Sequence, residues 1–357
     1  MTSSDGPAGP ASLSFLVESY PDGADALIEF RNQNRPTARD RAYFDWRFLA
    51  RPCRLKPITV WALLKDRRVG ALTVFPHDYH VLDAEYPIGV LGDISVLPEY
   101  RGQGIAGALF RFLPQVGALR PLRGCLVLPN EDAARSLMRA GWVEIQRVGR
   151  LLHFLDVSPR LQRVVRNEQL AQVLARPLNW AGRVASCWRP ADARGRFQGG
   201  VLPDLDERFD DLWRRVDKRG KIVGLRDRRY LNWRFLLHPT EKYKVFALTE
   251  SERLCGYIMY RQANGTCYVE DAFCVGEETC SGNLLVQFVR HVRDTGSFAT
   301  IAARVNRSFL KLPWRRAGFI RRPDYQGALV PPQLAESIRG TGGGAAAWHL
   351  TGGDKDV

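Results

Sequence analysis

The chain has 357 residues, of which 45% are hydrophobic and 25% are charged, and its formal net charge is +14. This length suits two domains, and the composition is typical of a globular protein. No apolar run reaches the roughly 18 residues of a membrane-spanning helix, and the seven cysteines include no CxxC pair, so neither a membrane span, a disulfide framework nor a metal site is predicted.

The positive charge is spread along the whole chain and is carried mostly by arginine. A basic surplus can serve a nucleic acid, an anionic membrane or an anionic ligand. Because the chain has no dense Lys/Arg block, zinc finger or aromatic–basic RNA motif, we expect no nucleic-acid partner. The first residues, 1–10, lack the basic start of a secretory signal, which predicts a cytoplasmic protein.

The first part of the chain alternates between predicted strands and predicted helices. The strands are expected at 14–18, 59–64, 69–80, 88–96 and 124–128, with one or two more in 142–156. The helices are expected at 25–32, 39–49, 105–117 and 132–140. A hairpin turn at 65–68 joins two of the strands, and Pro114 is expected to kink or end its helix early.

The composition changes after this first series. Residues 158–200 are predicted to be a linker that contains one helical stretch, 161–174. Residues 338–347 are rich in Gly and Ala, so the C-terminal segment 332–357 is predicted to be a flexible tail. Its apolar island around Trp348 is compatible either with docking on the body or with a disordered end.

The chain also repeats itself. Tyr43–Leu49, read as Tyr-Phe-Asp-Trp-Arg-Phe-Leu, is echoed by Tyr230–Leu236, read as Tyr-Leu-Asn-Trp-Arg-Phe-Leu, and a proline follows each three residues later. A strand–turn–strand pattern comes next in both places, with Gly70 or Gly256 in its second strand.

A third echo lies further on in both halves. Asn130 precedes an Ala-Gly-Trp triplet, and Asn306 precedes an Ala-Gly-Phe triplet at nearly equal spacing. Three echoes in the same order indicate two copies of one domain. The predicted domains are residues 11–157 and 201–331.

The most informative motif is the run Arg101-Gly102-Gln103-Gly104-Ile105-Ala106-Gly107, which follows an apolar strand and opens a helix. Glycines allow the backbone to approach a ligand closely. The N–H groups and the positive dipole at a helix N-terminus bind anions. The motif therefore predicts a phosphate site.

The same motif resembles the acyl-CoA pyrophosphate loop of the GNAT acyltransferase superfamily, whose pattern is Arg or Gln, two residues, Gly, one residue, then Gly or Ala. The match is full, and Val96-Leu97-Pro98-Glu99-Tyr100 precedes it as the usual Val-x-Pro-x-Tyr. The resemblance implies an α/β (α+β) chain of two GNAT-like domains, each a mixed, mostly antiparallel twisted sheet flanked by helices. It also implies an N-acetyltransferase or related N-acyltransferase that uses acetyl-CoA or another acyl-CoA as co-substrate.

By this resemblance, strands 88–96 and 124–128 splay apart and the pantetheine arm lies between them. The arm is expected to contact the backbone near Ile94 and Val96, where an N–H would also meet the thioester carbonyl. Asn130 corresponds to a cofactor-contacting position, although an N-cap of the following helix explains it equally well. The expected pyrophosphate ligands are Arg101, Gly102, Gln103, Gly104, Ile105, Ala106 and Gly107.

Transfer to an amine requires the loss of a proton. Asp93, on the strand that enters the loop, is the candidate base, and an Asp hydrogen-bonded to neighbouring backbone is the alternative. The tyrosine that usually serves as acid seven residues after the asparagine is replaced here by Leu137. Polar residues of the nearby hairpin are either substitutes for it or structural: His77, Tyr79, His80 and Tyr86.

Trp46 and Arg47 lie on the predicted helix that borders the acceptor pocket in this superfamily. An arginine there fits an acidic acceptor such as a carboxylate or a phosphate-bearing sugar. However, the pair recurs as Trp233-Arg234 in the second copy, which favours a packing role for the tryptophan and a surface ion pair for the arginine.

The second copy has lost the phosphate loop, because Glu277 and Glu278 stand at the aligned place and would repel an anion. We therefore expect a degenerate second domain and an acceptor that is a small molecule or a sugar amine. Two other functions remain open. One is a non-catalytic acyl-CoA sensor, which the missing tyrosine favours, and the other is an aminoacyl-tRNA-dependent transferase, which the intact loop disfavours.

Overall fold

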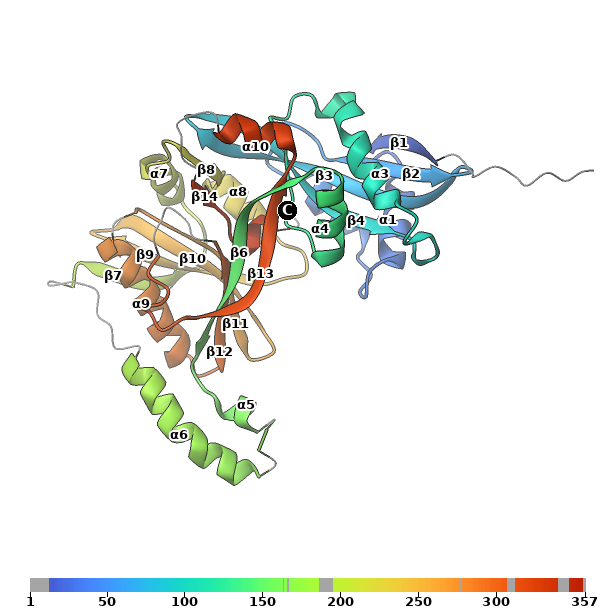
Figure 1. Ribbon diagram of the computed structural model, residues 1–357. Coiled ribbons are helices and arrows are strands. Elements are labelled where there is room, and N and C mark those ends of the chain that lie inside the picture. The colour runs from blue at the N-terminus through green and yellow to red at the C-terminus, as the bar shows by residue number, and fades with distance from the viewer. Residues whose placement is uncertain are drawn as a thin grey trace, which may run out of the picture.

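The computed structural model describes residues 13–162, 164–165, 167–185, 195–276, 278–306, 312–339 and 347–355. Two seven-stranded sheets, which we call sheet A and sheet B, form its centre and are flanked by helices (Figure 1). Most strand pairs are antiparallel, so the predicted fold class is confirmed. No helix within the described ranges is both long and apolar enough to cross a lipid bilayer.

Sheet A comes mainly from the first half of the chain. Its strand order is β1-β2-β3-β4-β5, with β8 paired to the end of β3 and β14 paired to β8. The pairs β4–β5 and β14–β8 are parallel. The strands are β1 (Leu13–Ser19), β2 (Ile58–Leu64), β3 (Arg67–Leu82), β4 (Ala84–Val96), β5 (Cys125–Leu126), β8 (Lys221–Gly224) and β14 (Ala347–His349).

Sheet B comes mainly from the second half and has the order β13-β6-β12-β11-β10-β9-β7. Its one parallel pair among the described strands is β11–β12. The strands are β6 (Val143–Phe154), β7 (Phe197–Leu202), β9 (Tyr243–Glu250), β10 (Arg253–Ala263), β11 (Thr266–Cys274), β12 (Thr300–Val305) and β13 (Ile320–Val330).

Alternating side chains of sheet A bury its two faces against different helices. Trp61 and Phe75 pack with α1 (Ala24–Gln33) and α2 (Arg41–Phe48). Their neighbours Val60 and Val74 pack on the other face with α3 (Ile105–Phe112). The remaining helices are α4 (Glu131–Arg139), α5 (Ser158–Leu161), α6 (Glu168–Ala185), α7 (Arg208–Arg215), α8 (Arg228–Leu231), α9 (Glu278–Asp294) and α10 (Pro332–Arg339), with short helical turns η1 (Pro98–Tyr100), η2 (Leu113–Gln115), η3 (Gly117–Leu119), η4 (Asn232–Leu236) and η5 (Gly352–Asp354).

Local sequence signals explain several boundaries. The hairpin between β2 and β3 turns on Lys65 and Asp66, both with positive φ, as a two-residue turn requires. Helix α3 ends at Phe112, and Pro114 lies in the short turn after it. The predicted helix 161–174 was misplaced, because α6 begins only at Glu168 and contains Pro177.

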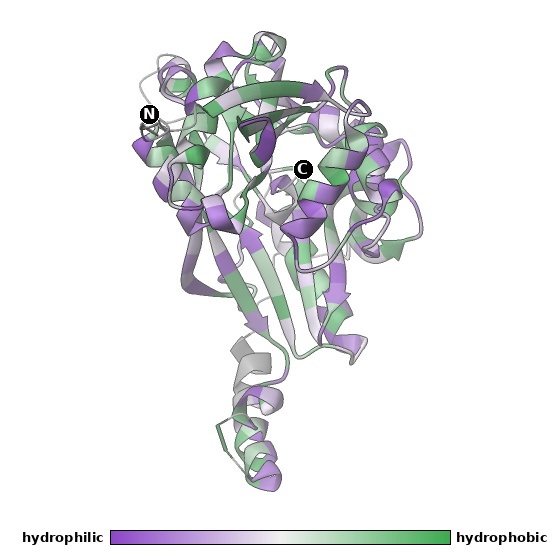
Figure 2. Ribbon diagram, turned by 90° about the vertical axis from the view of Figure 1, so that its right-hand side faces the viewer, coloured by the Kyte–Doolittle hydropathy of each residue, from purple (hydrophilic) through white to green (hydrophobic). Residues whose placement is uncertain are grey.

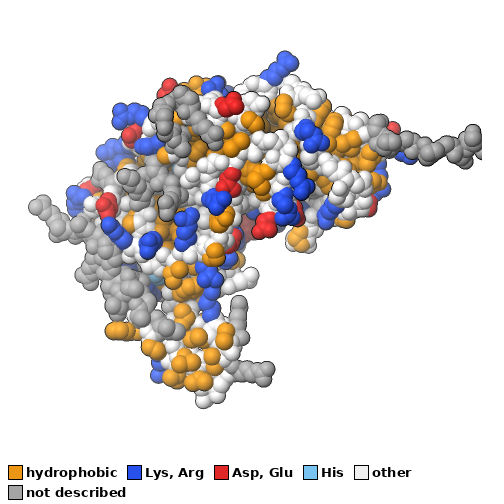
Figure 3. All heavy atoms as spheres, viewed as in Figure 1, with side chains coloured by type: hydrophobic (Ala, Val, Ile, Leu, Met, Phe, Trp, Pro, Cys, Tyr) orange, Lys and Arg blue, Asp and Glu red, His pale blue; other side chains and the backbone are white. Residues whose placement is uncertain are grey.

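Helix α6 stands off from the two sheets (Figures 1 and 2). Hydrophobic side chains gather over α5 and α6, whereas basic side chains are scattered over the same face of the molecule (Figure 3). Val173 and Trp180 of α6 are exposed. The scattered basic side chains on this face agree with the even spread of arginine along the sequence.

The two halves exchange strands. Strand β6, from the first half, pairs with β12 of the second half through Thr300–Val305. In return, Leu329 of β13 bridges to Val127, directly after β5 of the first half. Each sheet is thus completed by the other half, and the domain limits expected from the sequence stay a prediction.

The two copies of the Tyr-x-x-Trp-Arg-Phe-Leu motif pack against each other. The indole N–H of Trp46 donates to the Trp233 carbonyl at 2.9 Å, and the indole N–H of Trp233 donates to the Trp46 carbonyl at 2.9 Å. The two rings stack with centroids 5.3 Å apart. This reciprocity confirms the packing role predicted for the tryptophans and is what two related copies facing each other would produce.

The expectation of a flexible C-terminal tail was wrong for residues 332–339 and 347–355. They form α10, β14 and η5, and Trp348 and Leu350 are buried. Apolar burial and pairing with β8 hold this segment in place. Residues 340–346 of the predicted tail lie outside the described ranges.

A buried ionic cluster fixes the end of this segment. The Arg226 guanidinium lies 3.1 Å from a carboxylate oxygen of Asp271 and 2.7 Å from one of Asp354. All three side chains are buried. Thr351 adds a capping box with Asp354, so the chain end is tied to sheet B by charge and by hydrogen bonds.

We expect Arg226→Met to lower the free energy of unfolding by about 3–5 kcal/mol, because two buried carboxylates lose their counter-charge. Urea unfolding at neutral pH measures this. The control Arg219→Met removes an exposed arginine paired with Asp217 and should change stability by less than about 0.5 kcal/mol. Equal effects of the two substitutions would contradict the role assigned to the cluster.

Candidate functional site

Strands β4 and β5 diverge and open a cleft. They pair only at Gly89–Cys125 and Val90–Leu126, and beyond these residues the two strands separate. The predicted splay is therefore present. A cleft of about 490 Å³ begins there and is lined on the β5 side by Val127, Leu128, Pro129, Asn130 and Ala133.

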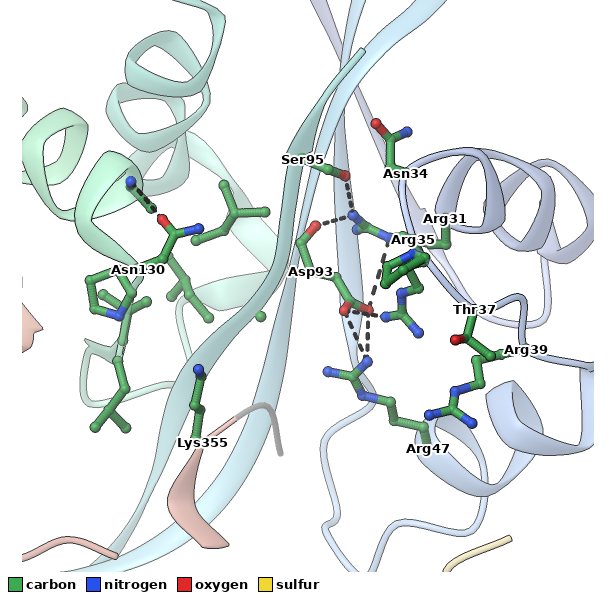
Figure 4. Close-up of a pocket in the computed structure, with 18 of the residues that line it drawn as sticks. Arg31, Asn34, Arg35, Thr37, Arg39, Arg47, Asp93, Ser95, Asn130 and Lys355 are labelled. Carbon is green, nitrogen blue, oxygen red and sulfur yellow. Dashed lines mark hydrogen bonds and ion pairs between the residues drawn. The ribbon is translucent and has the colours of Figure 1, made fainter. Parts of the chain in front are cut away.

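The opposite wall of the cleft comes from α1, α2 and the loop between them. Strand β4 runs between the two walls, as Figure 4 shows. The β4 residues that face the cleft are Leu91, Gly92, Asp93, Ile94 and Ser95. The residues of the α1–α2 wall are Arg31, Asn34, Arg35, Pro36, Thr37, Arg39, Tyr43 and Arg47, and Lys355 completes the lining.

Strand β4 carries a β-bulge in the middle of the cleft. Its partners on β3 jump from Thr73–Gly92 to Ala71–Ser95, so Asp93 and Ile94 oppose a single residue. Asp93 has φ of +54°, a left-handed conformation that Asp tolerates better than most residues. A bulge leaves its extra residue out of the ladder, which frees backbone groups at this point.

Three arginines surround Asp93. One Arg47 nitrogen donates to both carboxylate oxygens at 2.9 Å, and Arg35 donates to one of them at 2.6 Å. Arg31 donates to the Asp93 carbonyl and, at 2.8 Å, to the Ser95 hydroxyl. The cluster therefore ties both helices to the bulge (Figure 4).

The surroundings of Asp93 argue against the role of catalytic base predicted for it. Burial alone would raise the pKa of Asp93, but Arg47, Arg31 and Arg35 outweigh it and hold the pKa well below the ordinary value. A carboxylate so stabilised has little affinity for a proton. These contacts favour a structural role for Asp93. Arg47 is a buried partner of it rather than the surface ion pair expected.

The predicted phosphate loop follows β4 directly. Gly102 and Gly104 have φ of +80° and +77°, and a Cβ at either position would meet only open space. Gly104 is the N-cap of α3. The Arg101 side chain donates to the Val96 carbonyl at 3.1 Å. An exposed, left-handed glycine loop at a helix N-terminus fits a pyrophosphate, as the sequence indicated.

Two other expectations have mixed outcomes. The Asn130 side chain accepts a hydrogen bond from the Ala133 N–H at 2.9 Å, so it is the N-cap of α4, and it also lines the cleft. Ile94 lines the cleft too, whereas Val96 does not. The contacts predicted between these residues and a cofactor stay predictions.

No replacement for the missing tyrosine comes from the hairpin. Leu137 is fully buried in the core. Burial and the neighbouring arginines lower the pKa of His77 well below its ordinary value, and burial raises that of Tyr79 well above it. The residues that line the cleft do not include His77, Tyr79, His80 or Tyr86.

The corresponding place in the second half is filled. Strands β11 and β12 pair only from Thr266–Thr300 to Val269–Ala303, and the C-terminal segment enters beyond that point. Thr351 bridges to Val305, and Arg234, the echo of Arg47, donates to the Gly353 carbonyl. Glu278 begins α9, whereas Glu277 lies outside the described ranges.

Sequence reasoning missed Arg31, Arg35, Arg39 and Lys355. Arg31 offered one signal, because a charged residue four positions after Leu27 falls on the buried stripe of its helix. Lys355 offered none, since only the folded path of the C-terminal segment brings it to the cleft.

Residues 21–142 match a sequence profile described as the Acetyltransferase (GNAT) family. The N-terminal part of this chain is a GNAT-family domain. The matched residues include the glycine loop, the bulged strand and the cap of α4. A comparison with curated proteins finds no match to the sequence.

Solved structures show the same fold over most of the chain. A protein from Enterococcus faecalis V583, described as a probable N-acyltransferase, superposes with a TM-score of 0.63 at 13% identity, over 90% of this chain and 74% of that one. A tandem GNAT protein from the clavulanic acid biosynthesis pathway gives 0.53 at 12% identity, over 89% and 98%. Saccharomyces cerevisiae N-myristoyltransferase with bound myristoyl-CoA gives 0.54 at 11% identity, over 92% and 84%.

We expect Asp93→Asn to lower the free energy of unfolding by about 3–5 kcal/mol, because Arg31, Arg35 and Arg47 lose the negative charge of the carboxylate that they share. Urea unfolding at pH 7 measures the change. Asp25→Asn is the matched control, since Asp25 is exposed and its ion-pair partner Arg41 is exposed as well.

The pH dependence sharpens this test. A carboxyl group with a depressed folded-state pKa stabilises the fold above its unfolded pKa, and this stabilisation is lost as the pH falls below about 4. The unmodified protein should therefore lose stability more steeply in acid than Asp93→Asn. Parallel stability curves would contradict the ion-pair assignment.

Proposed function

We propose that this protein is an N-acyltransferase that moves an acyl group, most simply acetyl, from acyl-CoA to the amine of a small molecule. The observation that carries the proposal is the continuity of three parts: the splayed cleft, the bulge at Asp93 and the glycine loop at Gly102–Gly104, all on or directly after β4. The family match and the shared fold support it.

The loop and the cleft divide the binding of acyl-CoA between them. Pyrophosphate would bind the N–H groups of 102–107 at the start of α3. The pantetheine arm would lie between β4 and Asn130, which places the thioester beside the bulge. A backbone N–H at Ile94, turned out of the ladder by the bulge, would donate to the thioester carbonyl and stabilise the developing oxyanion.

The acceptor amine would approach from the α1–α2 wall. Its nitrogen lone pair forms the new C–N bond, the C–S bond breaks, the thiolate of coenzyme A leaves, and the amine proton passes to water. No covalent acyl-enzyme is involved. Asp93 takes no part as a base, but its arginine partners hold the bulge in the shape that this geometry needs.

The positive charge of the cleft would favour the deprotonated acceptor amine, which a general base would otherwise have to produce. Among the described residues that line the cleft, the cationic side chains outnumber the carboxylates, so we take the potential near the bulge to be positive. A positive potential lowers the pKa of a bound ammonium group. The acceptor would therefore be held as the neutral amine, which is the nucleophilic form.

A second candidate is an acyl-CoA-binding protein without turnover. It is favoured by the burial of Leu137 at the position of the usual acid and by the ion-paired state of Asp93. Acetyl-CoA-dependent release of free thiol with a panel of amines separates the two candidates. Thiol release above the no-amine rate supports transfer, and binding with no release supports the sensor.

Acyl-CoA binding is tested first by thermal unfolding with acetyl-, butyryl- and octanoyl-CoA. A ligand at 100 times its dissociation constant stabilises the folded state by about 2.7 kcal/mol. We expect a clear rise in Tm with at least one of them. An unchanged Tm with all three at millimolar concentration would overturn the proposal.

The site itself is tested by Gly104→Glu. The substitution places a side chain at a positive φ and a negative charge where the pyrophosphate would bind, so the affinity for acetyl-CoA should fall by at least about tenfold in calorimetry. Gly117→Glu adds the same charge at an exposed glycine outside the loop and should bind normally. Undiminished binding by a folded Gly104→Glu protein would contradict the site assignment.

A further inference from the structure

The residues that line the cleft carry an unusual charge. Among the described lining residues, five are cationic, namely Arg31, Arg35, Arg39, Arg47 and Lys355, and one is a carboxylate, Asp93. The lining therefore has a formal excess of four positive charges. Arginines that are ion-paired with Asp93 can have a purely structural role. The cations outside the Asp93 cluster are therefore the ones to consider as ligand-binding residues.

Arg39 and Lys355 lie outside that cluster. Within the described ranges, neither forms an ion pair with a carboxylate. Arg39 is half-buried, and its guanidinium lies over the Tyr43 ring at 5.0 Å from the centroid. Stacking on an aromatic ring fixes the plane of a guanidinium and leaves its N–H groups free to bind an oxyanion.

The loop between α1 and α2 holds Arg39 in this position. The Arg39 N–H donates to the Asn32 side chain at 2.9 Å, and the Asn32 amide donates to the Arg39 carbonyl at 2.9 Å. These two hydrogen bonds clamp the backbone. The side chain is therefore presented by a fixed backbone rather than by a free surface loop.

Arginines also surround a neighbouring histidine. His238 packs against Tyr43 with ring centroids 6.2 Å apart. Burial first, and then Arg234, Arg39 and Arg47, lower the pKa of His238 to about 4. The same potential that opposes a proton on this ring favours an anion nearby.

We infer that the acceptor amine carries an anionic group, a carboxylate or a phosphate, which binds to Arg39 on the α1–α2 wall of the cleft. This inference rests on the proposed function and adds the class of its acceptor. An oxyanion there completes the coordination of Arg39 and neutralises part of the excess charge. The amine of the same molecule then reaches toward the bulge at Asp93.

Because Arg39 lies on the α1–α2 wall, we expect the anionic group to belong to the acceptor rather than to the acyl group. Figure 4 shows Arg39 with the other arginines on one side of β4, and Asn130 with Lys355 on the other. The acyl-CoA would enter on the Asn130 side. Lys355 faces the cleft from there, so a charged acyl group would meet Lys355 before Arg39.

The test measures binding with matched pairs of amines by calorimetry, with coenzyme A present. The pairs are glycylglycine against glycylglycinamide, glutamate against glutamine, and glucosamine 6-phosphate against glucosamine. We expect the more anionic member of at least one pair to bind about tenfold or more tightly, since a charge-assisted contact is gained. Equal binding within every pair, or no binding of any anionic amine, would overturn the inference.

Three variants then assign the preference. Arg39→Gln should abolish it, Arg39→Lys should retain most of it, and Arg41→Gln should leave it unchanged because Arg41 is exposed and does not line the cleft. A preference that survives in Arg39→Gln would also overturn the inference. Binding of succinyl-CoA is compared with binding of acetyl-CoA to test whether the acyl group carries the anion. A preference for succinyl-CoA that is lost in Arg39→Gln would show that Arg39 binds an anionic acyl group, and it would overturn the inference.

The outcomes separate this inference from the proposed function. If acyl-CoA fails to bind while the anion preference is present and depends on Arg39, the proposed function fails and the anion site stands. If acyl-CoA binds and neutral amines are acylated as well as anionic ones, the proposed function stands and the inference fails.

Discussion

The buried contact between Asp93 and its three arginines is the interaction on which the candidate site depends. It joins α1 and α2 to the bulge of β4 and so shapes both the α1–α2 wall of the cleft and the strand opposite that wall. Isolated buried charges are costly, and the three arginines together stabilise the buried Asp93 carboxylate. The bulge, the helices and the positive potential of the cleft are therefore one connected feature.

The second half contributes to the first through exchange rather than through a second site. Strands β6 and β13 cross between the sheets, and Trp46 and Trp233 bond reciprocally where the two copies meet. The opening between β11 and β12 that corresponds to the cleft is occupied by the C-terminal segment, held by Arg226 and Arg234. One copy of the repeat thus keeps an open cleft, and the other uses the same opening to anchor the end that carries Lys355.

Much of the fold was predictable because its signals are local. The glycine loop, the two-residue hairpin turn at Lys65 and Asp66, and the cap at Asn130 depend on residues close together in the sequence. The splay of β4 from β5 followed from a resemblance that the loop motif carried. The surroundings of Asp93 were not predictable, because its arginine partners come from segments distant in sequence, and nearby arginines lower the affinity of a carboxylate for a proton.

The sequence by itself determined the repeat, the fold class and the place of the glycine loop, since each rests on local conformation or on a pattern repeated along the chain. Only the tertiary structure decided which strands the halves exchange, that the C-terminal segment is packed, and that Arg39 and Lys355 face the cleft together. These features depend on contacts between distant segments, where burial and charge pairing choose among arrangements that the local sequence allows equally.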